Sequence, residues 1–152
     1  MKYKTELHCH SRDGSGCANE SAEGIVKKYL EAGYTTVALT NHFGPFWNPE
    51  AREWWVGEVK EKYDAYEKLV KAAEGKLNII FGLECFFIEN RNDYLVFGFD
   101  REYLENLDPA LTKDLRSFAE DAHKRGMIII QAHPFRPHMT MKCPDFVDGI
   151  EV

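Results

Sequence analysis

The sequence lacks any long run of apolar residues. No segment of its 152 residues approaches the run of about 18 apolar residues that a membrane-spanning helix needs. The N-terminus, Met1-Lys2-Tyr3-Lys4, leads into a predicted strand and not into the apolar core of a signal peptide. We therefore expect a cytoplasmic protein that does not enter a membrane.

Closely spaced cysteine pairs are also missing. The four cysteines do not form the short paired spacings of zinc ribbons or redox motifs, and no secretory signal favours disulfides. We therefore expect free thiols at Cys9, Cys17, Cys85 and Cys143.

Basic residues are not in excess. The chain has 19 Lys and Arg against 25 Asp and Glu, which gives a net charge of −6. Because nonspecific nucleic-acid binding depends on Lys and Arg contacts with phosphates, we do not expect a nucleic-acid partner. The chain also has no internal repeat or linker, and its length suits a single domain over residues 1–152.

Predicted strands and helices alternate along the chain, which favours an α/β fold with a largely parallel sheet. Helices are predicted from Ser21 to a stop at Gly33, from about Pro49 to Glu74, and from a cap at Thr112 to Gly126. The long helix is expected to bury the face that carries Trp55, Val59, Tyr63, Tyr66 and Val70. Strands are predicted at 3–8, 35–40, 77–81, 94–99, 127–131 and 149–152, with a loop at 43–49 and a hairpin or a tight connection at 85–99.

His8 and His10 lie one residue apart at the end of the first predicted strand. Successive side chains of a strand point to opposite faces, so both imidazoles project the same way and Cys9 points to the other face. The two histidines can therefore chelate a metal ion.

Further metal-binding side chains follow the ends of other strands. The carboxyl ends of parallel strands meet at one edge of a sheet, where binding sites are commonly built. We therefore expect one cluster, to which the chain contributes His8, His10, His42, Glu84 and His133.

Imidazole and carboxylate ligands suit zinc, iron or manganese, and a carboxylate can bridge two ions. Paired ions stabilise the attacking and leaving oxygens of phosphoryl transfer and lower the pKa of bound water. A site with many histidines and few carboxylates also stays cationic, which favours a phosphorylated substrate. Arg136 follows His133 closely and is our candidate for binding the phosphate, although a solvated loop charge explains it equally well.

Five motifs in series resemble those of the PHP (polymerase and histidinol phosphatase) family, and they occur in the family's order. They are Leu7-His8-Cys9-His10-Ser11, Ala38-Leu39-Thr40-Asn41-His42, Gly82-Leu83-Glu84, Gln131-Ala132-His133-Pro134 and Asp148-Gly149-Ile150-Glu151-Val152.

The resemblance implies a distorted (β/α)7 TIM-like barrel with two or three divalent metal ions, and hydrolysis of a small phosphomonoester as in histidinol phosphatase. By matching positions, the ligands would be His8, His10, His42, Glu84 and His133. Glu84 would bridge two ions, and Glu84 and His133 are the candidate catalytic residues. Glu151 matches a supporting position and is left out of the ligand set.

The chain departs from the family pattern in three ways. Asn41 stands where most members have Asp, which removes a charge and a potential base. The ligand that many members add in a nearby loop has only approximate counterparts here, Asp93 and, less closely, Asp13. The final motif, which supplies an Asp and a His, is absent, so we expect a fragment of a longer protein or an incomplete barrel whose open edges favour self-association.

Two other functions remain open at this level. A nuclease or nucleotide phosphodiesterase could use the same metals, although the acidic net charge disfavours it. A noncatalytic metal-binding or regulatory domain would explain both Asn41 and the absent final motif.

Overall fold

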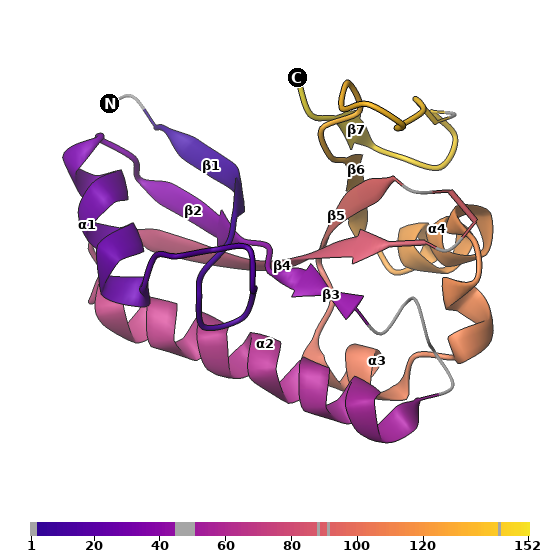
Figure 1. Cartoon of the computed structure of the whole chain (residues 1–152), viewed down its shortest axis with the longest axis horizontal. Coiled ribbons are helices and arrows are strands. Elements are labelled where there is room, and N and C mark those ends of the chain that lie inside the picture. The colour runs from indigo at the N-terminus through magenta and orange to yellow at the C-terminus, as the bar shows by residue number, and fades with distance from the viewer. Residues whose placement is uncertain (1–2, 45–50, 88, 91, 143) are drawn as a thin grey trace.

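The computed structural model describes residues 3–44, 51–87, 89–90, 92–142 and 144–152. Within these ranges the chain forms a mixed α/β fold around one curled, seven-stranded sheet (Figure 1). Most of the predicted loop at 43–49, the predicted helix start at Pro49, and Cys143 lie outside the described residues.

The N-terminal half of the sheet is parallel. Strands β1 (Thr5–Cys9), β2 (Thr36–Leu39) and β4 (Asn78–Phe86) are neighbours, and the short β3 (His42–Phe43) also pairs with β4. β4 extends five residues beyond the predicted strand end at Phe81, and β3 was not predicted. The two differences are linked, because the end of β4 is held in the sheet by its pairing with β3 and β5.

The C-terminal half of the sheet is mixed, in a sheet that was expected to be largely parallel. β5 (Asp93–Phe97) is antiparallel to both β4 and β6 (Ile128–Gln131), whereas β7 (Gly149–Ile150) is parallel to β6. The connection from β4 to β5 is too short for a parallel crossover, so these strands form the predicted hairpin. β1 and β7 are the end strands of a half barrel, and self-association along these edges remains a prediction.

Helix α1 (Ala22–Glu31) has the predicted ends. The Oγ of Ser21 accepts a hydrogen bond from the backbone N–H of Gly24 at 3.2 Å, and Gly33 follows the helix with a φ of 75°.

The helices after β5 begin differently from the prediction. α3 (Arg101–Asn106) is followed by a short 3-10 helix, Pro109–Thr112, and by α4 (Leu115–Lys124). The predicted cap at Thr112 is wrong, because Asp114 caps α4 by accepting a hydrogen bond from the N–H of Ser117 at 2.8 Å.

Helix α2 (Arg52–Ala73) runs along the outer face of the sheet (Figure 1). Its buried face is rotated from the predicted one: Lys62 is buried, whereas Val70 is exposed. The face carries a lysine because Glu58 and Glu61 neutralise the Nζ of Lys62, at 3.0 and 2.8 Å. Neither α2 nor any other described helix has the length and apolar content needed to cross a membrane.

Apolar side chains also fill the inner side of the curled sheet. Ala38, Leu95, Phe97 and Ala132 form a small buried cluster there. Gly82 on β4 leaves room for this packing, since a Cβ at this position would lie 2.5 Å from the ring of Phe97. The polar side chains at the ends of the strands therefore lie next to a buried apolar layer on the inner side of the sheet.

Candidate metal centre

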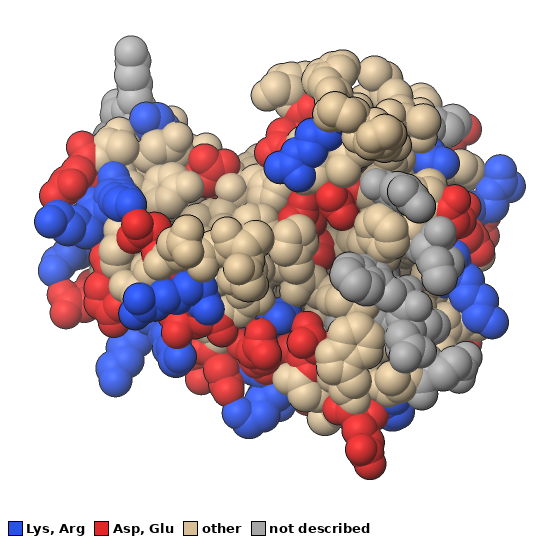
Figure 2. Space-filling view, viewed as in Figure 1, with Lys and Arg blue, Asp and Glu red and all other residues tan. Residues whose placement is uncertain are grey.

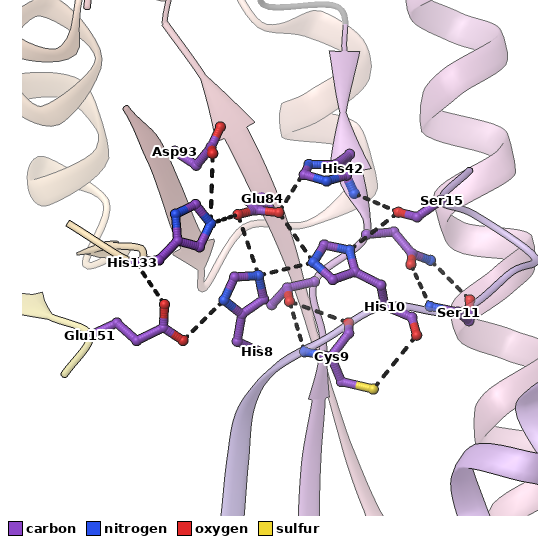
Figure 3. Close-up of polar contacts among 12 residues, drawn as sticks. His8, Cys9, His10, Ser11, Ser15, His42, Glu84, Asp93, His133 and Glu151 are labelled. Atoms are coloured by element: carbon purple, nitrogen blue, oxygen red, sulfur yellow. Dashed lines mark hydrogen bonds and ion pairs between the residues drawn. The ribbon is translucent and has the colours of Figure 1, made fainter. Parts of the chain in front are cut away.

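Four imidazoles surround the carboxylate of Glu84 (Figure 3). The Nε2 atoms of His8 and His133 lie 3.3 and 2.8 Å from Oε1. The Nε2 of His10 and the Nδ1 of His42 lie 3.1 and 2.9 Å from Oε2. The structure thus brings together all five residues of the predicted cluster, and each carboxylate oxygen faces its own pair of histidines.

Strand geometry places these side chains. His8 lies on β1 and His10 directly follows it; both point toward Glu84, whereas Cys9 points away into the core beneath α1. His42 on β3 is the direct partner of Glu84 on β4, and His133 follows the end of β6.

Glu84 is only 2% exposed, and its Oε2 lies within ion-pair distance of His10 and His42 but in a geometry that forms no hydrogen bond with any described residue. Burial by itself raises the pKa of this carboxyl group, but the contacts with His10, His42 and His8 hold it well below its usual range. A buried, ionised carboxylate within reach of four ring nitrogens requires a positive partner. A divalent cation fits this donor set, which consists of borderline nitrogens and one carboxylate.

Two of the histidines respond to the carboxylates around them. The contact with Glu84 is the largest influence on the pKa of His42 and raises it. Burial acts to lower the pKa of His8, but Glu84 and Glu151 together raise it above its ordinary value. The cluster therefore attracts positive charge, which protons or metal ions can supply.

The outer ring nitrogens of His8 and His10 are also held in place. The Nδ1 of His8 lies 3.0 Å from Oε1 of Glu151, and the Nδ1 of His10 lies 3.3 Å from the Oγ of Ser15. Such outer contacts fix the orientation of a ligating imidazole and leave its other nitrogen for a metal. Glu151 therefore contacts the cluster from outside it.

His133 adopts a left-handed backbone conformation with a φ of 27°, which is unusual for a residue other than glycine. The Oε2 of Glu151 accepts a hydrogen bond from its backbone N–H at 2.7 Å. Strained conformations of this kind persist where the surrounding structure holds them, and they concentrate at functional sites.

The cluster opens into a cavity of about 600 Å³. In the space-filling view the molecule is hollowed between the side that carries β1 and the side that carries β6 and β7 (Figure 2). Arg136 lines the cavity and is the one Lys or Arg among the described residues that does so. Its side chain is exposed and therefore accessible to an anion in the cavity.

The two additional ligand candidates differ in position. Asp93 lies beside the cluster, with Oδ2 3.6 Å from the Nε2 of His133, and burial followed by the charge of Glu84 raises its pKa. Asp13 instead accepts a hydrogen bond from the Nζ of Lys68 on α2 at 2.9 Å. The structure thus keeps Asp93 as a candidate and places Asp13 in an ion pair on the surface.

Asn41 is turned away from the cluster. Its Oδ1 accepts a hydrogen bond from the N–H of Ser11 at 2.8 Å, and its Nδ2 donates to the Oγ of Ser11 at 3.2 Å. The side chain is buried and holds the loop after β1. Asn41 therefore has a structural role at this position, and its lack of charge does not argue against catalysis.

A second cavity of about 420 Å³ adjoins the cluster. His42, Glu84 and Asp93 line one part of it, and the buried Lys62 with its ion-pair partners Glu58 and Glu61 lines another. The sequence signal for Lys62 was its place in the buried stripe, three residues after Val59 and four after Glu58.

Sequence reasoning missed two residues of the loop after β1. Ser15 accepts a hydrogen bond from the N–H of His42 at 2.9 Å and contacts His10. Cys17 lines the same cavity as the histidines. The available signal was that this Gly- and Ser-containing loop directly follows the His8–His10 pair in the sequence.

No family model and no curated protein matches the chain. Solved structures do match it. A protein of Bifidobacterium adolescentis predicted to be a metal-dependent phosphoesterase superposes with a TM-score of 0.59 at 14% identity, covering 97% of this chain and 76% of that one.

Two further structures give the same picture. A two-domain protein of Bacteroides vulgatus, which contains a predicted PHP-like metal-dependent phosphoesterase, matches with a TM-score of 0.61 at 20% identity over 99% of this chain and 44% of that one. PsfC of Pseudomonas syringae matches with a TM-score of 0.57 at 19% identity over 97% and 64%. The resemblance read from the sequence motifs is therefore confirmed in three dimensions: the chain has the fold of PHP-like metal-dependent phosphoesterases.

Proposed function

We propose that this chain is a metal-dependent phosphoesterase that hydrolyses a small phosphomonoester. The observation that carries the proposal is the geometry of Glu84, whose two oxygens each face a separate pair of histidines at 2.8 to 3.3 Å. One buried carboxylate between two sets of nitrogens is suited to bridge two divalent ions. The shared fold with predicted metal-dependent phosphoesterases supports the same conclusion.

The donor atoms fall into two groups. In the first group, His8, Glu84 and His133 each contribute one potential ligand atom, and these three atoms lie within 4.8 Å of one another. The second group consists in the same way of His10, Cys17 and His42. Zinc, iron or manganese bound there would lower the pKa of a water molecule and stabilise the charge on a phosphoryl group. We propose Glu84 and His133 as catalytic residues, because the Nε2 of His133 lies 2.8 Å from Oε1 of Glu84 within the first group.

The remaining residues would bind the metal or the phosphate, or orient the histidine rings. Asp93, 3.6 Å from His133, is positioned to add a carboxylate oxygen to that group. Arg136 lines the cavity with an exposed guanidinium group, which can form paired hydrogen bonds with a phosphate. Glu151 and Ser15 hold the rings of His8 and His10 in the orientations that ligation needs.

The test measures metal content and turnover together. Protein stripped of metal is reloaded with Zn²⁺, Mn²⁺ or Fe²⁺ and assayed on p-nitrophenyl phosphate and on bis-p-nitrophenyl phosphate. We expect hydrolysis of the monoester, and we expect Glu84→Gln and His10→Ala to lose metal and activity together. His123→Ala is the matched control, because this histidine contacts Asp148 outside the cavity.

Three results would contradict the proposal. Turnover of the diester alone would identify a phosphodiesterase. Bound metal without turnover of either ester would identify a noncatalytic metal-binding domain. Unchanged metal content in His10→Ala would refute the assignment of the site itself.

A further inference from the structure

Cys17 lies beside the metal cluster in the loop that joins β1 to α1. Its sulfur and one ring nitrogen each of His10 and His42 lie within 4.8 Å of one another. The thiol is free and exposed, and it lines the same cavity as the four histidines. This third donor therefore lies next to the pair of histidines that faces Oε2 of Glu84.

The loop that carries Cys17 is fixed by the residues it would join at a metal ion. Ser15, two residues earlier, contacts His10 and accepts a hydrogen bond from the backbone of His42. The N–H of Ser15 also donates a hydrogen bond to the carbonyl of Ser11. Ser11 in turn donates its own backbone N–H to the Oδ1 of Asn41. These contacts keep the loop against the two histidines, so the position of the thiol follows from the packing of the site.

Oε2 of Glu84 independently indicates a ligand at this position. It is buried and faces ring nitrogens of His10 and His42 at 3.1 and 2.9 Å, in a geometry that forms no hydrogen bond with any described residue. Cys17 is grouped with His10 and His42, and Oε2 of Glu84 lies 3.1 and 2.9 Å from ring nitrogens of the same two histidines, so a metal ion held by all four residues would have two nitrogens, one oxygen and one sulfur as donors. Four such donors match the coordination that Zn²⁺ takes in proteins.

We infer that Cys17 is a sulfur ligand of a second metal position, shared with His10, His42 and Oε2 of Glu84, and that it directs this position toward Zn²⁺ or Fe²⁺. The inference rests on the metal site of the proposed function. On binding, the Cys17 thiol gives its proton to water as the metal–sulfur bond forms. Manganese and magnesium, which prefer oxygen donors, bind such a position less well.

Cobalt provides the test, because a thiolate ligand adds a sulfur-to-cobalt charge-transfer band in the near ultraviolet. Metal-free, reduced protein is titrated with Co²⁺, and absorbance and bound metal are followed together. We expect the band in the unchanged protein. In Cys17→Ser the band should disappear and the second equivalent of metal should bind about tenfold more weakly or worse.

Two variants make the result specific. Cys9→Ala removes a thiol that is buried on the opposite strand face, and burial raises the pKa of this thiol to about 11, so the band should remain. Cys17→Asp supplies an oxygen in place of sulfur, so metal should still bind without the band, and preference should move toward Mn²⁺.

The outcomes separate this inference from the proposed function. Tight cobalt binding without the band in the unchanged protein would overturn the role of Cys17 and leave the histidine–glutamate site intact. A band that persists in Cys17→Ser would overturn it as well. No cobalt binding at all would overturn both the sulfur ligand and the metal site on which it rests.

Discussion

Glu151 contacts His8 on the side of the ring that faces away from Glu84. Its Oε1 lies 3.0 Å from Nδ1, and its Oε2 accepts a hydrogen bond from the backbone N–H of His133 at 2.7 Å. One carboxylate at the end of the described sheet thus positions two members of the cluster, one through its ring and one through its backbone.

We expect Glu151→Gln to weaken metal binding about 10- to 100-fold with little loss of stability, because the amide is a poorer acceptor for the ring N–H of His8. Titration with a competing chelator would measure this change. The matched control is Glu120→Gln, the same substitution at an exposed position of α4. Equal metal affinity in the two variants would show that Glu151 does not orient His8.

Replacing Gly14 or Gly57 by alanine should change the stability of the protein in opposite directions. A Cβ at Gly14 would lie 2.3 Å from Nδ2 of the buried Asn41, whereas a Cβ at Gly57 on α2 meets nothing within 4 Å. Gly14→Ala should lower the free energy of unfolding by about 1 to 3 kcal/mol. Gly57→Ala should raise it by about 1 kcal/mol through helix propensity. Urea unfolding measures both, and a neutral Gly14→Ala would mean that Asn41 does not hold the loop tightly.

Arg136 should affect substrate binding more than turnover. Loss of a charge-assisted contact with phosphate removes about 1.5 to 3 kcal/mol, so Arg136→Ala should raise KM for a phosphomonoester about 10- to 100-fold. Metal content should not change, since the guanidinium group is not a ligand. Arg116→Ala on α4 removes the same charge outside the cavity and serves as the control. Equal KM values would place Arg136 outside the substrate site.

Tyr63 should make stability depend on alkaline pH. Burial, followed by the charge of Asp100, raises the pKa of Tyr63 from 10.0 to about 12. Between these values the unfolded chain binds fewer protons at this residue than the folded chain, so its contribution to stability is complete below pH 10 and declines as pH rises toward 12.

The difference between the unchanged protein and Tyr63→Phe isolates this effect. The free energy of unfolding, measured with urea at several pH values from 9 to 11.5, should decline less in the variant. Tyr3→Phe, at an exposed position, should leave the decline unchanged. A decline that is identical in all three proteins would assign the alkaline loss to other groups.

The fold was predictable where local patterns decide it. Ser21 and Gly33 correctly marked the ends of α1, because capping depends on neighbouring residues alone. The buried face of α2 was predicted in part: Trp55 and Val59 are buried as expected, but Val70 is exposed and Lys62 is buried, because ion pairs with Glu58 and Glu61 neutralise its charge. The antiparallel pairing of β5 with β4 agrees with the hairpin considered at 85–99, whereas its antiparallel pairing with β6 was not predicted.

For the candidate site, the sequence alone predicted which five side chains lie together. Alternation along β1 and the recurrence of His or Glu at strand ends were enough to group His8, His10, His42, Glu84 and His133. Only the tertiary structure assigned Asn41 to the loop, Glu151 to His8 and Cys17 to the cavity. The physical reason is distance along the chain: Ser11 and Asn41 are 30 residues apart and His8 and Glu151 are 143 apart, so no local pattern records that they meet.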